Sequence, residues 1–185
     1  MKHRVAFVLI VLAILTRLLP HPPNFTPITA AGLFGASVFG QLWLGIAIPL
    51  LSLFLSDLYI NNVVYDHFYD GFVWFGSLWV YLAFGMVSVL GRLMLHEKTT
   101  GIRVVIASLS ASTLFFLVTN FGVWLTSGMY PLTAEGLLAC YVAGIPFFGN
   151  TLLGDLFYSA VLFGGYAWTA RLWKQPQQAI RSINK

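Results

Sequence analysis

Apolar residues run along this chain in long blocks that are separated by short polar or proline-rich stretches. The blocks cover residues 5–19, 28–40, 42–59, 72–95, 104–126 and 152–173. Long apolar blocks of this kind are typical of helices that cross a membrane, where about 20 residues span the hydrocarbon core. The pattern therefore predicts an all-α fold: a polytopic membrane helical bundle with about six transmembrane helices, forming one domain over residues 1–185.

The shortest block, residues 28–40, either borrows flanking residues or spans the membrane only in part. At 1.5 Å per residue it covers about 20 Å of a core that is about 30 Å thick. The distribution of basic residues favours a full crossing by this block, because cytoplasmic loops of membrane proteins are enriched in Lys and Arg. If this block crosses and the N-terminus is cytoplasmic, Arg17 is the only one of the 10 basic residues on the outer side. The residues on the cytoplasmic side are then Lys2, Arg4, Arg92, Lys98, Arg103, Arg171, Lys174, Arg181 and Lys185.

The stretch from residue 127 to residue 158 differs from a plain membrane span. It is apolar, but it carries Glu135, Asn150 and Asp155 and is interrupted by Pro131, Pro146 and several glycines. An acid at membrane depth costs about 2.5–3.5 kcal/mol on insertion scales and tends to mark a functional site. Broken backbone is tolerated there only where it is packed in protein or lines a cavity. We therefore predict that residues 133–148 form a re-entrant or lid segment that does not cross, just before the last helix.

Composition supports an integral membrane protein. Hydrophobic residues make up 58% of the chain and charged residues 9%, and the mean hydropathy is +0.82, whereas about 25% of an ordinary soluble domain is charged. The net charge of +4 does not indicate nucleic-acid binding, because the basic residues flank apolar spans. A single cysteine, Cys140, excludes an intrachain disulfide, and the four histidines are scattered. We predict no metal site and no cofactor.

Polar and aromatic residues gather at the predicted outer ends of the helices. An arginine beside an aspartate can form an ion pair in low dielectric, while the remaining donors and acceptors face a ligand and aromatic rings form its apolar walls. The alternative is that Arg17 simply pairs with Asp57 or Asp155 to hold helix ends together. We predict a solute-binding site made of Arg17, His21, Asn24, Asp57, His67, Asn120, Trp124, Glu135, Asn150 and Asp155.

Two further patterns concern packing. Gly32, Ala36 and Gly40 recur every four residues and form one face of small residues, on which another helix can approach closely. This face either packs inside the protein or docks a partner membrane protein. The hydroxyls of Ser108, Ser110, Ser112 and Thr113 either line a pore or bond back to helix carbonyls, and back-bonding is favoured.

Sequence signatures of enzymes are missing from the chain. It contains no G-x-S-x-G, no H-E-x-x-H and no phosphate-binding G-x-x-x-x-G-K-[ST] pattern. We therefore expect the protein not to be an enzyme, and any ATP-driven transport would need a partner.

The stretches RLLPHPPNFTP at residues 17–27 and SGMYPLTAEGLLACYVAGIPFFGNTLLGDLFYSAVLFG at residues 127–164 resemble a family of small bacterial membrane proteins described as transport proteins. That family is similar in size and six-span layout to the S-components, the substrate-binding subunits of energy-coupling factor vitamin transporters. The resemblance implies a multi-pass protein of the bacterial inner membrane with both termini cytoplasmic.

The resemblance also implies a function, namely uptake of a vitamin or related micronutrient through an outward-facing pocket. The implied partners are a transmembrane coupling protein and its ATPase subunits. S-components carry an A-x-x-x-A docking pattern in the first helix, whereas here Ala6 and Ala13 are seven residues apart; Gly32, Ala36 and Gly40 are the nearest substitute, and a solitary transporter is an open alternative. The other alternative is a non-transport accessory or assembly subunit whose polar cluster is structural.

Overall fold

The computed structural model describes residues 2–183, and the side chains of residues 3–172. Of the basic residues used above for topology, Lys185 lies outside the described residues, as do the side chains of Lys2, Lys174 and Arg181. The described chain forms six α-helices: α1 (Lys2–Leu15), α2 (Ile28–Val38), α3 (Leu42–Tyr59), α4 (Leu78–Leu95), α5 (Gly101–Thr126) and α6 (Ala134–Ile183). A 3₁₀ turn (Thr16–Leu18) follows α1, a π-helical turn (Ile60–Val64) extends α3, and a 3₁₀ turn (Asp66–Phe68) lies in the loop before α4.

Four segments are long and apolar enough to cross a membrane: Leu42–Val64, Leu78–Leu95, Gly101–Thr126 and Ala134–Leu172. Their outward faces carry exposed leucine, valine, phenylalanine and tryptophan side chains, as expected of a surface in contact with lipid. α1 and α2 are shorter, with 14 and 11 residues. By its apolar helices the chain is a multi-pass membrane protein.

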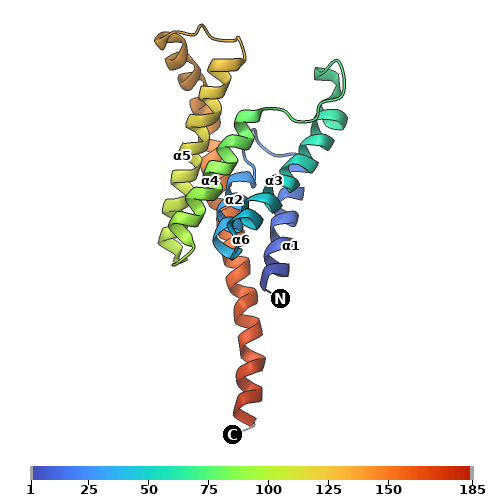
Figure 1. Ribbon diagram of the computed structural model, residues 1–185, viewed down its shortest axis with the longest axis vertical. Helices are drawn as coiled ribbons and strands as arrows, with labels where there is room; N and C mark the ends of the chain where they lie inside the picture. The colour runs from blue at the N-terminus through green and yellow to red at the C-terminus, as the bar shows by residue number, and fades with distance from the viewer. Residues whose placement is uncertain (1, 184–185) are drawn as a thin grey trace.

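The start of α1 and the end of α6 lie at the same end of the bundle (Figure 1). We call this the inner end, following the topology predicted from the basic residues, and the opposite end the outer end. The α3–α4 loop and the α5–α6 loop lie at the outer end (Figure 1). The chain therefore changes direction at every connection, so that successive helices alternate in direction.

The short helix α2 is the centre of the bundle. Residues 28–37 of this helix are all buried, and α2 contacts each of the other five helices (Figure 1). Small residues make this possible, because a helix without large side chains lets neighbouring backbones approach closely. A methyl group added at Gly45 of α3 would lie 2.7 Å from the Ala36 Cα of α2. The position of α2 therefore depends on glycines in the helices around it.

The face of Gly32, Ala36 and Gly40 is used mainly inside the protein. A Cβ at Gly32 would meet the Ser88 hydroxyl of α4 at 3.1 Å, and Ala36 lies fully buried against α3. Gly40 lies beyond the end of α2, is exposed and has open space around its Cα. The docking prediction is therefore corrected for Gly32 and Ala36, because a partner protein would have to displace α3 and α4 to reach them.

Replacing Gly91 by alanine is expected to destabilise the protein by about 1–3 kcal/mol, the usual cost of overpacking. The new Cβ would lie 2.8 Å from the Leu33 Cα, which is backbone and cannot move aside without shifting α2. Gly85 lies in α4 as Gly91 does, but a Cβ added to it would have no neighbouring atom within 4 Å. Gly85→Ala should therefore be neutral or slightly stabilising. Thermal unfolding of both variants in detergent tests this. Equal melting temperatures for the two variants would contradict the close approach of α2 and α4.

Residues 133–148 do not form a separate re-entrant segment, which corrects the prediction for this region. Residues 134–148 belong to α6, a single helix of 50 residues that is about 75 Å long at 1.5 Å per residue. Its glycines allow close contacts and do not break the helix. A Cβ at Gly144 would lie 2.5 Å from the Asn120 Oδ1, and one at Gly154 would lie 3.1 Å from the Thr26 backbone nitrogen.

Helix α4 begins at Leu78, six residues after the predicted start of its span. The segment before it is held in a non-helical conformation by Asn62, which follows α3. The Asn62 Nδ2 donates to the Val73 carbonyl at 2.7 Å, and the Asn62 Oδ1 accepts from the Val73 N–H at 2.7 Å. Because both polar groups of the Val73 backbone are bonded to this side chain, they are not available to a helix.

Candidate solute-binding site

A buried ion pair joins the outer ends of α1 and α3. The Arg17 Nη2 lies 2.9 Å from the Asp57 Oδ1, and the two side chains are only 13% and 12% exposed. The Tyr81 hydroxyl of α4 donates to the Asp57 Oδ2 at 2.7 Å, and the Arg17 Nη1 donates to the Ser56 Oγ at 2.5 Å. The arrangement is electrically neutral and connects three helices.

Next to this ion pair lies a cavity of about 340 Å³ between α4, α5, α6 and the loop after α1. Three of the ten residues predicted to bind solute line it, namely Arg17, Asn24 and Asn120. Threonines and phenylalanines supply most of the other walls. The lining includes Thr26, Thr29, Thr119, Thr151, Phe115, Phe116, Phe147 and Phe148. The site thus combines amide and hydroxyl groups with aromatic walls, which is the usual composition of a small-molecule pocket.

The loop of residues 19–27 forms the outer edge of this cavity. Its four prolines exclude a helix, and Asn24 has a positive φ of 62°, a conformation that asparagine tolerates better than most residues. The Asn150 Nδ2 of α6 donates to the Pro23 carbonyl at 2.9 Å. Asn150 therefore fixes the loop and is not among the residues that line the cavity.

His21 lies in a neighbouring hollow of about 410 Å³. Arg17 and Thr26 line both this hollow and the cavity described above. The His21 Nδ1 lies 2.9 Å from the Pro22 carbonyl, and the side chain is exposed. His21 thus shares a hollow with Arg17 but does not line the cavity.

Asp155 lies deeper in the bundle, with 1% of its surface exposed. The Ser112 Oγ of α5 lies 2.5 Å from the Asp155 Oδ2. Asp155 does not line the cavity, but Thr151, one helical turn earlier on the same face of α6, does. Of the two predicted pairings of Arg17, the one with Asp57 is present in the structure and the one with Asp155 is not.

Three further predicted residues lie away from both the cavity and the ion pair. Trp124 donates from its Nε1 to the Pro131 carbonyl at 3.0 Å, in the α5–α6 loop. Glu135 is exposed in the first turn of α6. His67 is exposed in the α3–α4 loop, with its Nδ1 3.5 Å from the Asp66 carboxylate. Hydrophobicity alone places all three at the outer end, but it does not show which way their side chains face.

Sequence reasoning missed the threonines of the cavity and the role of Tyr81. Threonine is common in membrane helices, where its hydroxyl bonds back to a carbonyl, so its presence alone is a weak signal. The spacing of Thr151 and Asp155, four residues apart on one helix face, is the one pattern that could have indicated a polar surface inside the bundle. Back-bonding, which was favoured for the α5 hydroxyls, occurs at Ser112 and Thr113.

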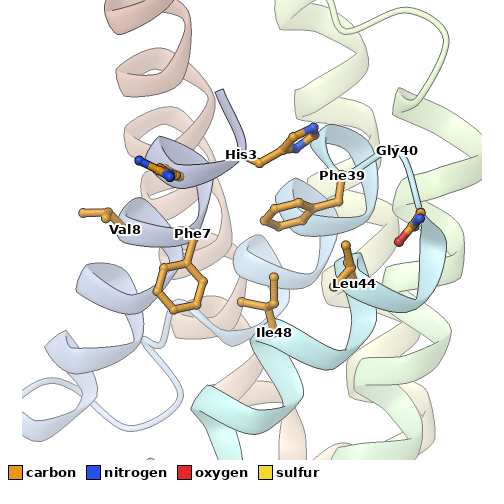
Figure 2. A pocket seen from close by; sticks show the side chains of 9 residues that line it. His3, Phe7, Val8, Phe39, Gly40, Leu44 and Ile48 are labelled. Atoms are coloured by element: carbon orange, nitrogen blue, oxygen red, sulfur yellow. The ribbon is translucent and has the colours of Figure 1, made fainter. Parts of the chain in front are cut away.

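Two other hollows are lined mostly by apolar residues. The larger, of about 750 Å³, lies at the inner end where α1 begins, and Phe7, Val8, Leu44 and Ile48 form much of its wall (Figure 2). His3 stacks on Phe39 there, with ring centroids 5.6 Å apart (Figure 2). A second hollow of about 590 Å³ between α1 and α3 shares Phe7 and Ile48 with it. Neither contains any of the ten predicted solute-binding residues, and such surfaces suit lipid chains.

Fold and cavity together define a class: a multi-pass α-helical membrane protein with a polar cavity at one end of its bundle. Within this class, the chain belongs to DUF6580, a family of unknown function that matches residues 1–178. No curated protein and no solved structure matches the chain. The family match covers both stretches on which the resemblance to transport proteins rests, but it names neither a solute nor an S-component.

Proposed function

We propose that this protein is a membrane transport protein that binds a small solute in the cavity at its outer end. The observation that carries this proposal is the meeting of Arg17, Asn24 and Asn120 around one cavity, although Asn120 lies in α5, far along the chain from the turn and loop after α1 that carry Arg17 and Asn24. A protein that only fills the membrane has no need for polar side chains around a hollow at this depth, because unpaired polar groups are costly there.

The lining limits the chemistry of the solute. The charge of Arg17 is balanced by Asp57 at 2.9 Å, so the cavity favours a neutral or zwitterionic compound over a strong anion. Amide and hydroxyl groups can bond to its polar atoms, and the four phenylalanines suit a flat ring. The cavity volume of about 340 Å³ is near the lower limit for ligand pockets. A vitamin or related micronutrient of small size fits these requirements.

Mass spectrometry of small molecules released from the detergent-purified protein is the direct test of this proposal. We expect one compound in stoichiometric amount, and the same compound should raise the melting temperature when it is added back, because a ligand that binds only the folded state stabilises it. If no compound is released and none of a panel of vitamins raises the melting temperature, the transport proposal fails.

Asn24→Gly is expected to weaken solute binding about tenfold, the effect of losing one net hydrogen bond of about 1.4 kcal/mol. Glycine accepts the positive φ of this position, so the loop keeps its conformation while the cavity loses one amide. The matched control is His67→Ala, which changes an exposed side chain outside the cavity. Binding affinities from isothermal calorimetry should differ between these variants. Equal affinities would exclude Asn24 from the site.

A second function is supported by the completeness of the ion-pair network. Asp57 bonds to both Arg17 and Tyr81, and Arg17 also bonds to Ser56, as expected if these groups only hold helices together. A non-transport accessory or assembly subunit would need nothing more. Under this reading, crosslinking in the native membrane should capture a stable protein complex, and no solute should be released from the purified chain.

For the transport function, two energy sources remain open proposals. The resemblance to S-components implies a transmembrane coupling protein with ATPase subunits in the bacterial inner membrane. Because Gly32 and Ala36 pack against α4 and α3 of the same protein, such a partner would have to bind another surface. A solitary transporter driven by an ion gradient is the alternative, and it fits the buried acid Asp155 of α6.

A further inference from the structure

Asp155 is a buried acid without a cationic partner in the described part of the chain. It lies on α6, 1% exposed, and neither of the ion pairs found among residues 3–172 includes it. Its Oδ2 lies 2.5 Å from the Ser112 Oγ, whereas its Oδ1 has no hydrogen-bond partner within the described part of the protein. An ionised carboxylate is poorly stabilised in such surroundings, so the site needs a positively charged species to bind there.

The surroundings of Ser112 point to a proton as that species. The Ser112 hydroxyl has one hydrogen but lies within hydrogen-bond distance of two oxygens, the Asp155 Oδ2 at 2.5 Å and the Ser108 carbonyl at 3.0 Å. When Asp155 is protonated, it donates to Ser112, and Ser112 donates to the Ser108 carbonyl. When Asp155 is ionised, Ser112 turns its hydrogen to the carboxylate and leaves the carbonyl. The two protonation states therefore have different hydrogen bonds to the backbone of α5.

On the outer side, hydroxyl groups connect Asp155 with the proposed solute cavity. Thr151, one turn earlier on α6, lines that cavity. Thr29 of α2 lines it as well and lies beside the Asp155 carboxyl. From α2 and α5 the groups facing the carboxyl are thus Thr29 and Ser112, neither of which is charged, and no titratable side chain of α1 from residue 3 onward is paired with it. Arg17, the one charged residue of the cavity, is paired with Asp57.

On the inner side, two further hydroxyls lie between Asp155 and the inner end of the bundle. The Ser108 and Ser159 Oγ atoms are 3.4 Å apart, and both residues are buried. Both also line a hollow of about 410 Å³ between α5 and α6, which reaches Thr99 and Thr100 in the inner loop. Asp155 thus lies between a polar cavity at the outer end and a hollow that reaches the inner end.

From this placement we propose that Asp155 is a proton-binding site and that its proton is the coupling ion of transport. The proton reaches Asp155 from the outer cavity past Thr29 and Thr151, and it leaves past Ser112 toward the inner hollow that Ser108 and Ser159 line. The coupling half of this proposal rests on the proposed transport function, whereas the binding of a proton at Asp155 does not.

A hydrophobic carbodiimide, dicyclohexylcarbodiimide, tests proton binding directly in the full-length protein in detergent. It reacts only with a protonated carboxyl: the acid proton passes to a carbodiimide nitrogen, and the carboxylate oxygen bonds to the central carbon. Peptide mass spectrometry then locates the adduct in the natural protein, so no variant has to fold. Asp57, paired with Arg17, is the internal control and should stay unmodified.

We expect modification at Asp155 whose rate falls about tenfold per pH unit once the carboxyl ionises. Sodium at constant ionic strength should not change this rate, and Asp155→Asn should not react. No adduct at Asp155, a rate independent of pH, or protection by sodium would each overturn the proposal. Solute release by denaturation is measured on the same preparation. If no solute is released and no vitamin raises the melting temperature although modification is normal, the transport function alone is refuted. Solute release without modification would refute the proton site alone.

Discussion

Replacing Arg17 by alanine is expected to destabilise the folded protein by about 3–5 kcal/mol. The substitution leaves the Asp57 carboxylate, 12% exposed, without its counter charge, and Tyr81 is then its remaining hydrogen-bond donor from another residue's side chain. A buried charge that loses its partner is far more costly than a pair that is absent from the start. The loss should appear as a much lower melting temperature in detergent and a lower denaturant midpoint.

Two further variants make this prediction specific. In the double variant Arg17→Met with Asp57→Leu both charges are removed, so most of the lost stability should return. Arg103→Ala, at an exposed residue of the inner end, should change stability by less than about 0.5 kcal/mol. If Arg17→Ala is as stable as Arg103→Ala, the ion pair does not hold α1 and α3 together. A stable double variant that no longer binds solute would show that Arg17 also contributes to the site.

The class of fold could be predicted from the sequence because lipid imposes a simple rule. Every backbone polar group in the membrane must be bonded within the protein, so long apolar blocks become helices. The ends of α3 and α5 follow the ends of their blocks closely. The start of α4 could not be found in this way, because it depends on Asn62 bonding to Val73, eleven residues later. Such a contact leaves no periodic signal.

The prediction of a lid failed for a different physical reason. Pro146 and the glycines of residues 133–154 were interpreted as helix breakers, which is their usual role in water. In a membrane bundle, glycine more often permits close packing, and Gly144 against Asn120 and Gly154 against Thr26 are cases of this. The residue types alone do not distinguish the two roles, because the difference lies in what packs against them.

The candidate site was predictable only in part. Helix ends could be assigned to one side of the membrane, which places Arg17, Asn24 and Asn120 at the same depth. Which side chains face one another depends on the rotation of each helix, and apolar blocks without a polar face do not define it. His67 and Glu135 were therefore grouped with the cavity although they lie outside it. Asp155 differs, because an acid inside an apolar block is a signal in itself.

Asp155→Leu is expected to separate stability from function, in contrast to Arg17→Ala. The Asp155 Oδ1 has no partner among the described residues, and an unsatisfied buried polar atom costs about 1–3 kcal/mol. Leucine removes this atom, and Ser112 keeps its hydrogen bond to the Ser108 carbonyl at 3.0 Å. The melting temperature should therefore stay the same or rise, while uptake of the released compound into proteoliposomes under a proton gradient falls to background.

Ser159→Ala serves as the matched control for this substitution, since it removes a buried hydroxyl from the same helix without removing an acid. It should slow uptake without abolishing it. A structural role of Asp155 predicts the opposite result for Asp155→Leu: a loss of several kcal/mol in stability, with uptake reduced only in proportion to the folded protein. That outcome would favour the accessory-subunit function. High stability with lost uptake is expected instead if the protein keeps a costly buried acid for proton-coupled transport.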